Sequence, residues 1–224
     1  DVSAAIHPGS FFAVVAAVGA GKSTLLRLAA GLLRPTRGHI HLDTRPIHRL
    51  TPRDRAARLP YIAQRPDVAG AFSVYEVVSL SRFALGRDDH AVHRAIERVR
   101  LTDRAEDAFH HLSAGQQQRI ALARALAQVD PNPAADAHAR CIIADEPIAA
   151  LDPVHARLAL DLLRDFTSRG GAVLASLHDL TAAARYADHA LVLGPGGDVV
   201  SVGPASDSLA PHHLERAFGA RFAS

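Results

Sequence analysis

Short apolar runs alternate with longer amphipathic stretches along most of the chain. The short runs are typical of buried strands, and the longer stretches repeat apolar residues every three to four positions, which is typical of helices. The expected strands are 2–6, 11–15, 39–42, 59–63, 141–144, 172–176 and 189–193, and the expected helices are 22–30, 153–168, 180–186 and one beginning at 51. This alternation predicts an α/β fold with a mostly parallel sheet covered by helices.

One long segment departs from the alternation. From Ser73 to Gln128 strand signals vanish and helical spacing dominates. Ser113 stands where an N-cap is expected for a helix that runs to Gln128. The stretch 130–139 is rich in proline, alanine and aspartate without periodicity and predicts a surface loop.

Composition excludes several classes of protein. With 48% hydrophobic and 21% charged residues, the 224-residue chain has the composition of a soluble globular protein. Its net charge of +2 is too small to indicate nucleic-acid binding, and neither a membrane-spanning run nor a signal peptide is visible. The single cysteine excludes an internal disulfide and suits the cytosol. Without any methionine, Asp1 is not expected to be the native start, so we expect an upstream segment to have been removed.

Histidines are numerous but do not form a metal-binding pattern. The chain has 14 of them, including the pairs at 110–111 and 212–213. They are scattered through polar stretches and lack the paired spacing of a zinc site. We therefore expect solvated surface histidines.

The segment 16–24, Ala-Ala-Val-Gly-Ala-Gly-Lys-Ser-Thr, connects an expected strand to an expected helix. This is the context of a phosphate-binding loop, in which small residues let backbone N–H groups close around a polyphosphate at a helix N-terminus. Lys22 supplies a charge for the phosphates, and the Ser23 hydroxyl is suited to Mg²⁺. The residues expected to bind nucleotide here are Gly19, Ala20, Gly21, Lys22, Ser23 and Thr24.

A second apolar strand, 141–144, ends in two acids, Asp145 and Glu146. A buried parallel strand would deliver them to the carboxyl edge of the sheet, where ligands bind in open α/β folds. Asp145 is suited to hold Mg²⁺, directly or through water, and Glu146 to polarise an attacking water. A core strand followed by a solvated turn would give the same pattern, so this motif alone leaves both interpretations open.

Four further segments complete a set of six, in an order that resembles the ATP-binding subunits of ABC transporters. These are the Q-loop-like 61–64, the signature-like 112–116 with its continuation 117–126, the D-loop-like 148–152 and the switch-histidine-like 176–179. Taken alone, Gln64 or His178 would be interpreted as a surface residue. The six motifs together cover nearly the whole chain and are far more specific than any one of them.

The resemblance implies a fold, cofactors and partners. The fold is a P-loop NTPase (RecA-like) core with a mostly parallel sheet, a small N-terminal antiparallel β part and an inserted helical subdomain. One nucleotide-binding domain would span 1–224, with the core at 1–72 and 128–224 and the helical signature subdomain at 73–127. ATP and Mg²⁺ are the implied cofactors. The implied partners are a second copy of the chain, integral membrane permease subunits and, indirectly, a periplasmic binding protein, at the cytoplasmic face of the inner membrane.

The resemblance also implies roles within one chain. Glu146, His178 and Gln64 would be the catalytic residues: Gln64 reaches the metal and the attacking water, and His178 contacts the γ-phosphate. The implied metal ligands are Ser23, Gln64 and Asp145.

Other roles reach across two chains. Ser113, Ala114, Gly115 and Gln116 would touch the nucleotide held by the opposite subunit, so a complete site would need two chains arranged head to tail. Asp152 would communicate across this dimer.

Three departures from the family pattern affect affinity rather than chemistry. Ala16 replaces a glycine, which would weaken binding if this position requires a positive φ, and Ala17 and Val18 replace the usual Pro-Asn. Ala114 replaces the middle glycine of the signature. The aromatic residue that stacks on adenine is expected upstream of Val2. None of these changes removes a hydrolytic residue, so we expect a competent ATPase.

Segments 34–38, 71–78 and 214–219 resemble importers of iron–siderophore, haem and cobalamin. The spacing of 32 positions between Ser113 and Asp145 is longer than usual, and an insertion there resembles haem-import subunits. Siderophore and cobalamin import remain alternatives. Alternatives of another class are a soluble ABC ATPase of DNA repair or translation, a nucleotide-binding module without turnover, and a P-loop kinase of small metabolites.

Overall fold

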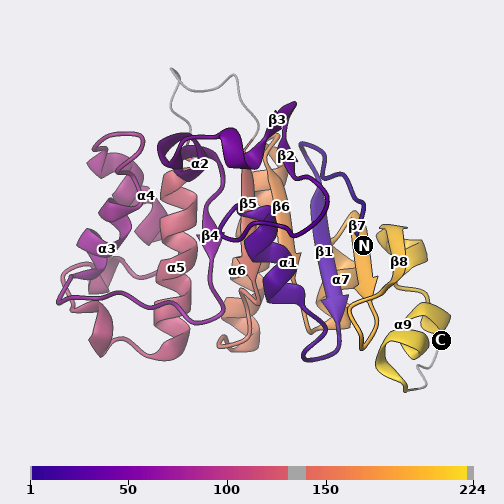
Figure 1. Cartoon of the computed structure of the whole chain (residues 1–224). Coiled ribbons are helices and arrows are strands. Elements are labelled where there is room, and N and C mark those ends of the chain that lie inside the picture. The colour runs from indigo at the N-terminus through magenta and orange to yellow at the C-terminus, as the bar shows by residue number, and fades with distance from the viewer. Residues whose placement is uncertain (1, 131–139, 221–224) are drawn as a thin grey trace.

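The computed structural model of the chain describes residues 2–130 and 140–220. A six-stranded sheet has the order β4-β5-β6-β1-β7-β8. The first five of these are parallel neighbours, whereas β8 pairs with β7 in the antiparallel sense. The carboxyl ends of the parallel strands therefore meet at one edge, the lower one in Figure 1. The strands are β1 (Phe11–Ala16), β4 (Tyr61–Ile62), β5 (Cys141–Asp145), β6 (Ala172–Ser176), β7 (His189–Leu193) and β8 (Val199–Pro204).

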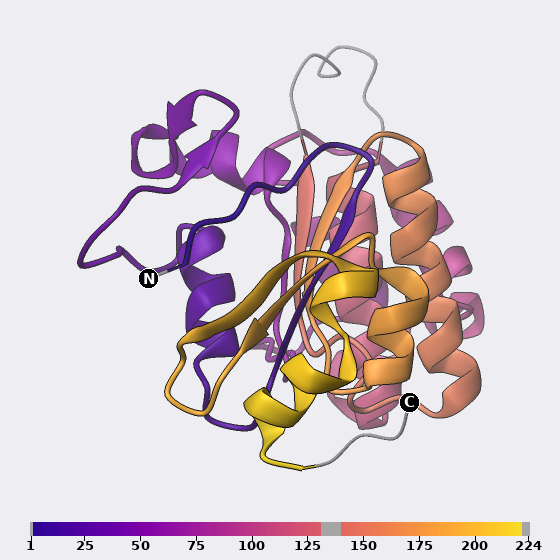
Figure 2. The ribbon, with the colours of Figure 1, turned by 90° about the vertical axis from the view of Figure 1, so that its right-hand side faces the viewer.

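Helices cover both faces of this sheet. Alternate residues of the central strands pack in two separate apolar clusters, one with α1 (Lys22–Ala29) and the other with α5 (Ala114–Gln128), α6 (Pro153–Ser168) and α7 (Leu180–Tyr186). Figure 2 shows α1 on one side of the sheet and the orange helices on the other. Burial on both faces explains why these strands are apolar throughout instead of alternating.

The helical segment forms the left side of the molecule in Figure 1. Here α3 (Val74–Leu80) and α4 (Asp89–Arg98) pack on each other and on α5. Reciprocal hydrogen bonds between Ser73 and Glu76 form a capping box at the start of α3. Between 74 and 128 the structure has helices and short 3₁₀ turns but no strand, as the periodicity predicts. The division of the chain into a core and a helical subdomain stays a prediction.

A small antiparallel β part is also present. It pairs β2 (His41–Leu42) with β3 (Arg45–Pro46). The following helix, α2 (Pro52–Arg58), begins where its capping pattern predicts, because the Thr51 side chain accepts a hydrogen bond from the N–H of Asp54.

The prediction of a strand at 2–6 is wrong. These residues have no strand partner, and 2–5 are exposed, so their apolar positions do not belong to a sheet face. The expected strands at 39–42 and 59–63 are shortened to two residues each. Three elements near the end were not predicted, namely the edge strand β8 and the helices α8 (Ala205–Ser208) and α9 (Pro211–Phe218). Residues 131–139 of the predicted loop lie outside the described residues.

Candidate nucleotide site

The phosphate-binding loop leaves the carboxyl end of β1 and enters α1. Gly19 and Gly21 have φ values of 84° and 94°, in the left-handed region that favours glycine. Ala16 is the last residue of β1, and it is absent from the described non-glycine residues with positive φ. The replacement of glycine by Ala16 therefore introduces no backbone strain.

Lys22 points into the loop that precedes it. Its Nζ donates to the carbonyl oxygens of Ala16 at 2.9 Å and Ala17 at 3.2 Å, and the residue is 6% exposed. Burial lowers the pKa of Lys22, while the negative charges of Glu146 and Asp145 partly offset this effect. The ammonium group is thus held inside the loop, within electrostatic range of both acids.

Asp145 ends β5 at the same edge and is 1% exposed. Ser176 Oγ donates to its Oδ1 at 2.7 Å, and the Tyr61 hydroxyl donates to its Oδ2 at 3.2 Å. Burial raises the pKa of Tyr61, which keeps this hydroxyl protonated as a donor. Sequence reasoning missed both hydroxyls. Both residues belong to segments that the sequence suggested for other roles, 61–64 and 176–179, and only the strand order and register place them beside β5.

The three expected catalytic residues lie together, because Gln64 and His178 both contact Glu146. Gln64 Nε2 donates to Glu146 Oε2 at 2.6 Å, and His178 Nε2 contacts the other carboxylate oxygen, Oε1. The backbone N–H of Glu146 donates to Ser176 Oγ at 2.8 Å, and its φ is 50°. A non-glycine residue in this region is strained by about 1–3 kcal/mol, and such residues cluster at functional sites.

A cavity of about 440 Å³ opens beside this cluster. Glu146 and His178 line it together with residues of the D-loop-like segment, of the segment between β6 and α7, and of α6 and α7 themselves. Water can therefore approach the Glu146 carboxylate, as a residue that activates water requires.

The donor set at this edge fits Mg²⁺. Ser23, Gln64 and Asp145 offer hydroxyl, amide and carboxylate oxygens, which are the ligands that this ion takes. Within residues 2–130 and 140–220, no group of three His, Cys, Asp or Glu side chains is arranged to hold a metal. The three residues would thus hold the ion together with phosphate oxygens and water, as is usual for Mg²⁺ in nucleotide sites.

The signature residues lie elsewhere, at the exposed start of α5. Ser113 Oγ accepts from the N–H of Gln116 at 3.3 Å, and Gln116 Oε1 accepts from the N–H of Ser113 at 2.8 Å. Both residues border an open hollow of about 840 Å³ that Arg104 and Asp107 also line. The P-loop and the two acids are not among the residues that line it. One chain therefore keeps its signature motif apart from its own phosphate loop.

The D-loop packs against the signature motif of its own chain. A Cβ at Gly115 would lie 2.9 Å from the carbonyl oxygen of Ala150, so this glycine permits a close approach of two backbones. Asp152 caps α6 by accepting from the N–H groups of Val154 and His155, both at 3.0 Å. The hydrogen bond from the His155 N–H, followed by the His155 side chain, lowers the pKa of the exposed Asp152. Ala114 is exposed and fits the helix start without strain.

This arrangement matches a known family. The sequence model of the ABC transporter family matches residues 1–149. The chain belongs to the ABC transporter family. It is an ATP-binding subunit of the ABC type, an ATPase coupled to transport.

Similar proteins carry names that concern hemin. The hemin import ATP-binding protein HmuV of Pseudomonas entomophila is 41% identical over 88% of this chain and 77% of its own length. HmuV of Agrobacterium fabrum is 36% identical over 98% of this chain and 84% of its own length. HmuV of Myxococcus xanthus is 40% identical over 96% and 82%.

Solved structures agree on the fold. An ATP-binding subunit of an ABC transporter has a TM-score of 0.80 at 27% identity and covers all of this chain and 88% of its own. A metal-chelate type ABC transporter in an inward-facing conformation has a TM-score of 0.75 at 26% identity, over 96% of this chain and 79% of its own. A dimeric ATP-binding cassette with ADP and Pi has a TM-score of 0.79 at 25% identity, over 92% and 89%.

Proposed function

We propose that the chain is the ATP-hydrolysing subunit of an importer whose cargo is haem. The observation that carries this proposal is the identity of 36–41% to three hemin import ATP-binding proteins, over most of each chain. The structural likeness to a metal-chelate type transporter supports the wider class of iron chelates. Siderophore and cobalamin are the other cargoes that the experiment below distinguishes.

In this proposal the site has two halves. The first half, which consists of the P-loop, Gln64, Asp145, Glu146 and His178, binds and cleaves ATP, and the second half is the signature segment 113–116. Lys22 and the loop N–H groups bind the phosphates, and Ser23, Gln64 and Asp145 hold Mg²⁺. When bound, the ion would neutralise charge on the phosphate oxygens. Glu146 would accept a proton from the water as the water oxygen bonds to the γ-phosphorus and the bond from that phosphorus to ADP breaks, which releases ADP and phosphate.

Both carboxylate oxygens of Glu146 are contacted, one by Gln64 and one by His178. Each oxygen keeps a second lone pair, so water can still donate to the carboxylate from the cavity that Glu146 lines. When nucleotide arrives, Gln64 and His178 would turn toward the metal and the γ-phosphate and leave the carboxylate to the attacking water.

A second copy of the chain completes the site. Ser113 is exposed and Gln116 is half-buried, and both border a hollow that no residue of the P-loop lines, so they can meet the nucleotide of a partner. The start of an α-helix suits an anion because of its N–H groups and dipole. Asp152, on the loop that packs against the signature, would report on this contact.

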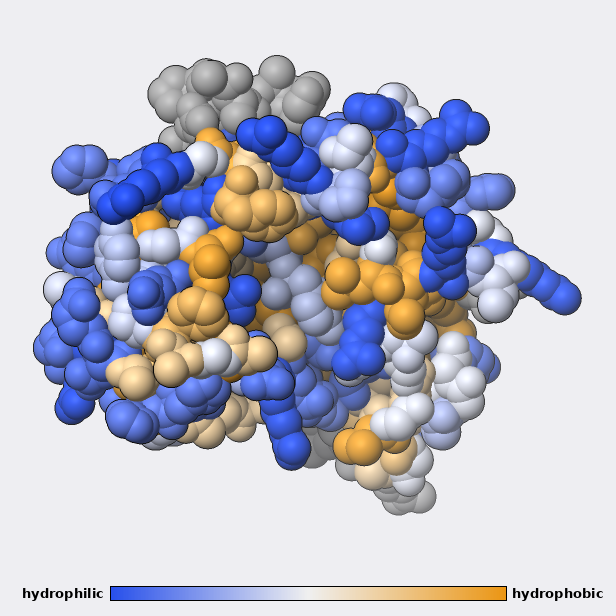
Figure 3. All heavy atoms as spheres, turned by 60° about the vertical axis from the view of Figure 1, so that its left-hand side comes forward, coloured by the Kyte–Doolittle hydropathy of each residue, from blue (hydrophilic) through white to orange (hydrophobic). Residues whose placement is uncertain are grey.

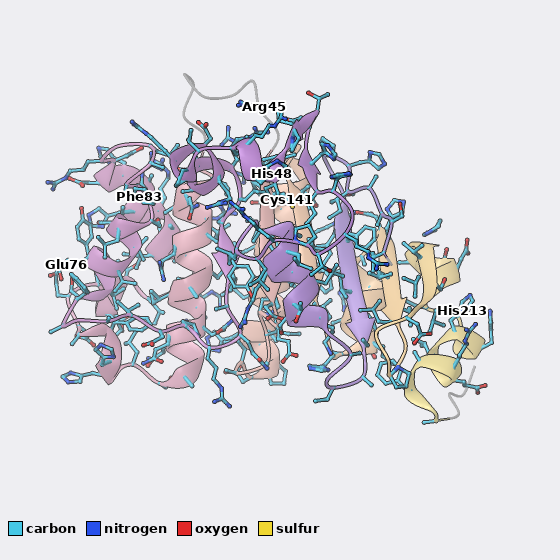
Figure 4. All side chains as sticks on the ribbon, in the orientation of Figure 1. Arg45, His48, Glu76, Phe83, Cys141 and His213 are labelled. Atoms are coloured by element: carbon cyan, nitrogen blue, oxygen red, sulfur yellow. The ribbon has the colours of Figure 1, made fainter. Side chains whose placement is uncertain are left out.

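A permease would bind the helical part of the chain and hold it at the cytoplasmic face of the membrane. None of the helices in the described ranges is long and apolar enough to cross a membrane. Leu80 and Phe83 are 51% and 70% exposed and line a groove of about 340 Å³. Figure 4 labels Phe83 in the upper part of the helical region, and Figure 3 shows apolar patches between polar ones on this side of the molecule.

Crosslinking tests the permease contact. A cysteine placed at Phe83 in this groove, or at Asp67 or Phe72 in the segment that precedes α3, should capture the permease in the assembled transporter. Cys141 need not be removed, because it is buried and burial raises the pKa of its thiol to about 12. Capture only from cysteines in the range 209–220 would contradict this surface.

Growth on a single iron source tests the cargo. We expect inactivation of the gene in the organism that produces the chain to abolish growth on haem as the sole iron source. Growth on ferric siderophore and cobalamin-dependent growth should continue. Complementation with the wild-type chain should restore growth on haem, and the Glu146→Gln variant should not. Loss of growth only on siderophore or only in the cobalamin assay would reassign the cargo.

A further inference from the structure

Ser176 is hydrogen-bonded to both acids of the site, Asp145 and Glu146. It lies outside their strand and is the first residue of the switch-histidine-like segment 176–179. It ends β6, where the parallel register places it directly beside Asp145 of β5. The residue is fully buried. Its Oγ donates to Asp145 Oδ1 at 2.7 Å and accepts from the backbone N–H of Glu146 at 2.8 Å.

Asp145 and Glu146 both need the hydrogen bonds that this hydroxyl makes. Asp145 is 1% exposed, and a buried carboxylate oxygen without a hydrogen bond is costly. Glu146 adopts a φ of 50°, a conformation that persists only when surrounding groups fix it. Tyr61 serves the other oxygen of Asp145, so the two hydroxyls together fix the rotation of that carboxylate.

We propose that Ser176 is a positioning residue, which sets the carboxylate of Asp145 for Mg²⁺ and the backbone of Glu146 for its work as a base. The inference rests on the roles proposed above for these two acids. Ser176 would act through its hydrogen bonds to Asp145 and Glu146. Partners of this kind behind a metal ligand contribute about 10- to 100-fold to metal affinity or activity.

A matched pair of variants isolates the hydroxyl. Ser176→Thr and Ser176→Val add nearly the same volume to a packed position, so any overpacking is common to both. They differ in whether the side chain can donate to Asp145 and accept from Glu146. The two measurements are the Mg²⁺ concentration that half-saturates ATP binding and the steady-state hydrolysis rate at saturating Mg²⁺.

We expect Ser176→Val to raise the required Mg²⁺ about 10- to 100-fold, or to lower the rate by a similar factor. Ser176→Thr should stay within about threefold of the wild-type chain, since its hydroxyl can restore both hydrogen bonds. If neither variant folds, Ser176→Ala, which removes the hydroxyl without adding bulk, should show the same loss as Ser176→Val.

The control is Val173→Ala in the same strand. Val173 is buried in the apolar cluster on the opposite face of the sheet. Its truncation should lower stability and leave the Mg²⁺ requirement unchanged. Equal behaviour of Ser176→Thr and Ser176→Val, or a Ser176→Val that changes only stability, would overturn the inference.

A further variant, Asp145→Asn, separates this inference from the site assignment. It should raise the Mg²⁺ requirement at least as much as Ser176→Val. If Asp145→Asn has no effect on that requirement, the metal role of Asp145 is wrong, and the inference fails with it. If Asp145→Asn acts and Ser176→Val does not, the site assignment stands and only the role of Ser176 is refuted.

Discussion

The two halves of the nucleotide site differ in how far the side chains are buried and hydrogen-bonded within one chain. In the first half, Lys22, Asp145 and Glu146 are 1–8% exposed. Lys22 bonds to the backbone of its own loop, whereas Asp145 and Glu146 bond to side chains from other segments. In the second half, Ser113 is exposed and Gln116 is half-buried, and the side chain of each accepts a hydrogen bond from the backbone N–H of the other at the start of α5.

The difference shows which half is ready before any partner arrives. Buried charged groups need a complete set of hydrogen bonds, and their network keeps the first half in one arrangement. A helix start leaves backbone N–H groups without intrahelical partners, and the capping box satisfies only part of them. We therefore expect the first half to bind nucleotide without a partner chain, and the second half to act only on the nucleotide of a partner.

The sharpest test of the first half is Glu146→Gln. The amide keeps the shape of the carboxylate but cannot accept a proton, so hydrolysis should fall by about 10²–10⁴-fold. ATP binding should survive, because Lys22 and the loop are untouched. We expect steady-state assays to show the loss and sedimentation with ATP to show a stable dimer.

Two results would contradict this assignment. Wild-type turnover in purified Glu146→Gln would exclude Glu146 as the base. Loss of ATP binding together with hydrolysis would mean that the side chain supports the loop instead of the chemistry.

The second half is tested by Ser113→Arg. An unpaired charge at a contact between two chains costs several kcal/mol of desolvation, so ATP-driven dimerisation should weaken by more than about a hundredfold. Nucleotide binding to the monomer should not change, since Ser113 lies apart from its own P-loop. Sedimentation and nucleotide titration of the same sample would measure both. Weaker binding to the monomer would place Ser113 in the site of its own chain.

The sequence predicted the central strands well for a physical reason. Strands β5, β6 and β7 and helices α6 and α7 begin at the predicted residues, because burial on both faces makes the strand runs apolar and short. The segment 2–6 has similar apolar content, yet it is not a strand. Pairing depends on distant segments, and local pattern contains no information about them.

The candidate site was also predicted only in part from the sequence. The resemblance to the ABC family implied that Gln64, Glu146 and His178 act at one place, and the structure places both Gln64 and His178 in contact with Glu146. Ser176 and Tyr61 were missed as partners of Asp145. Their roles follow from strand order and register, which place both beside β5, and neither property can be read from a single segment.

A smaller effect is expected where the signature motif packs against the D-loop of the same chain. In Gly115→Ala the new Cβ would lie 2.9 Å from the carbonyl oxygen of Ala150, so the D-loop or the start of α5 must shift. Overpacking of this kind costs about 1–3 kcal/mol. Urea unfolding should show the loss. Ala114→Ser is the control, because residue 114 is exposed and should tolerate the change. Equal stability of Gly115→Ala and the wild-type chain would show that the contact with Ala150 is not close in solution.

The smallest effect is expected at Ala16, where the chain departs from the usual glycine. Ala16 ends a strand and is fully buried, so its methyl group packs in the core without backbone strain. Ala16→Gly should therefore lower stability by about 0.5–1 kcal/mol, because glycine is unfavourable in a strand. Affinity for ATP and for inorganic triphosphate should stay within about twofold, since Lys22 still donates to the carbonyl of residue 16. Unfolding in urea and titration with both ligands would measure these changes. A clear gain in affinity for both ligands would show instead that the loop needs glycine at its first position, and that the first half of the site is less complete than its hydrogen bonds indicate.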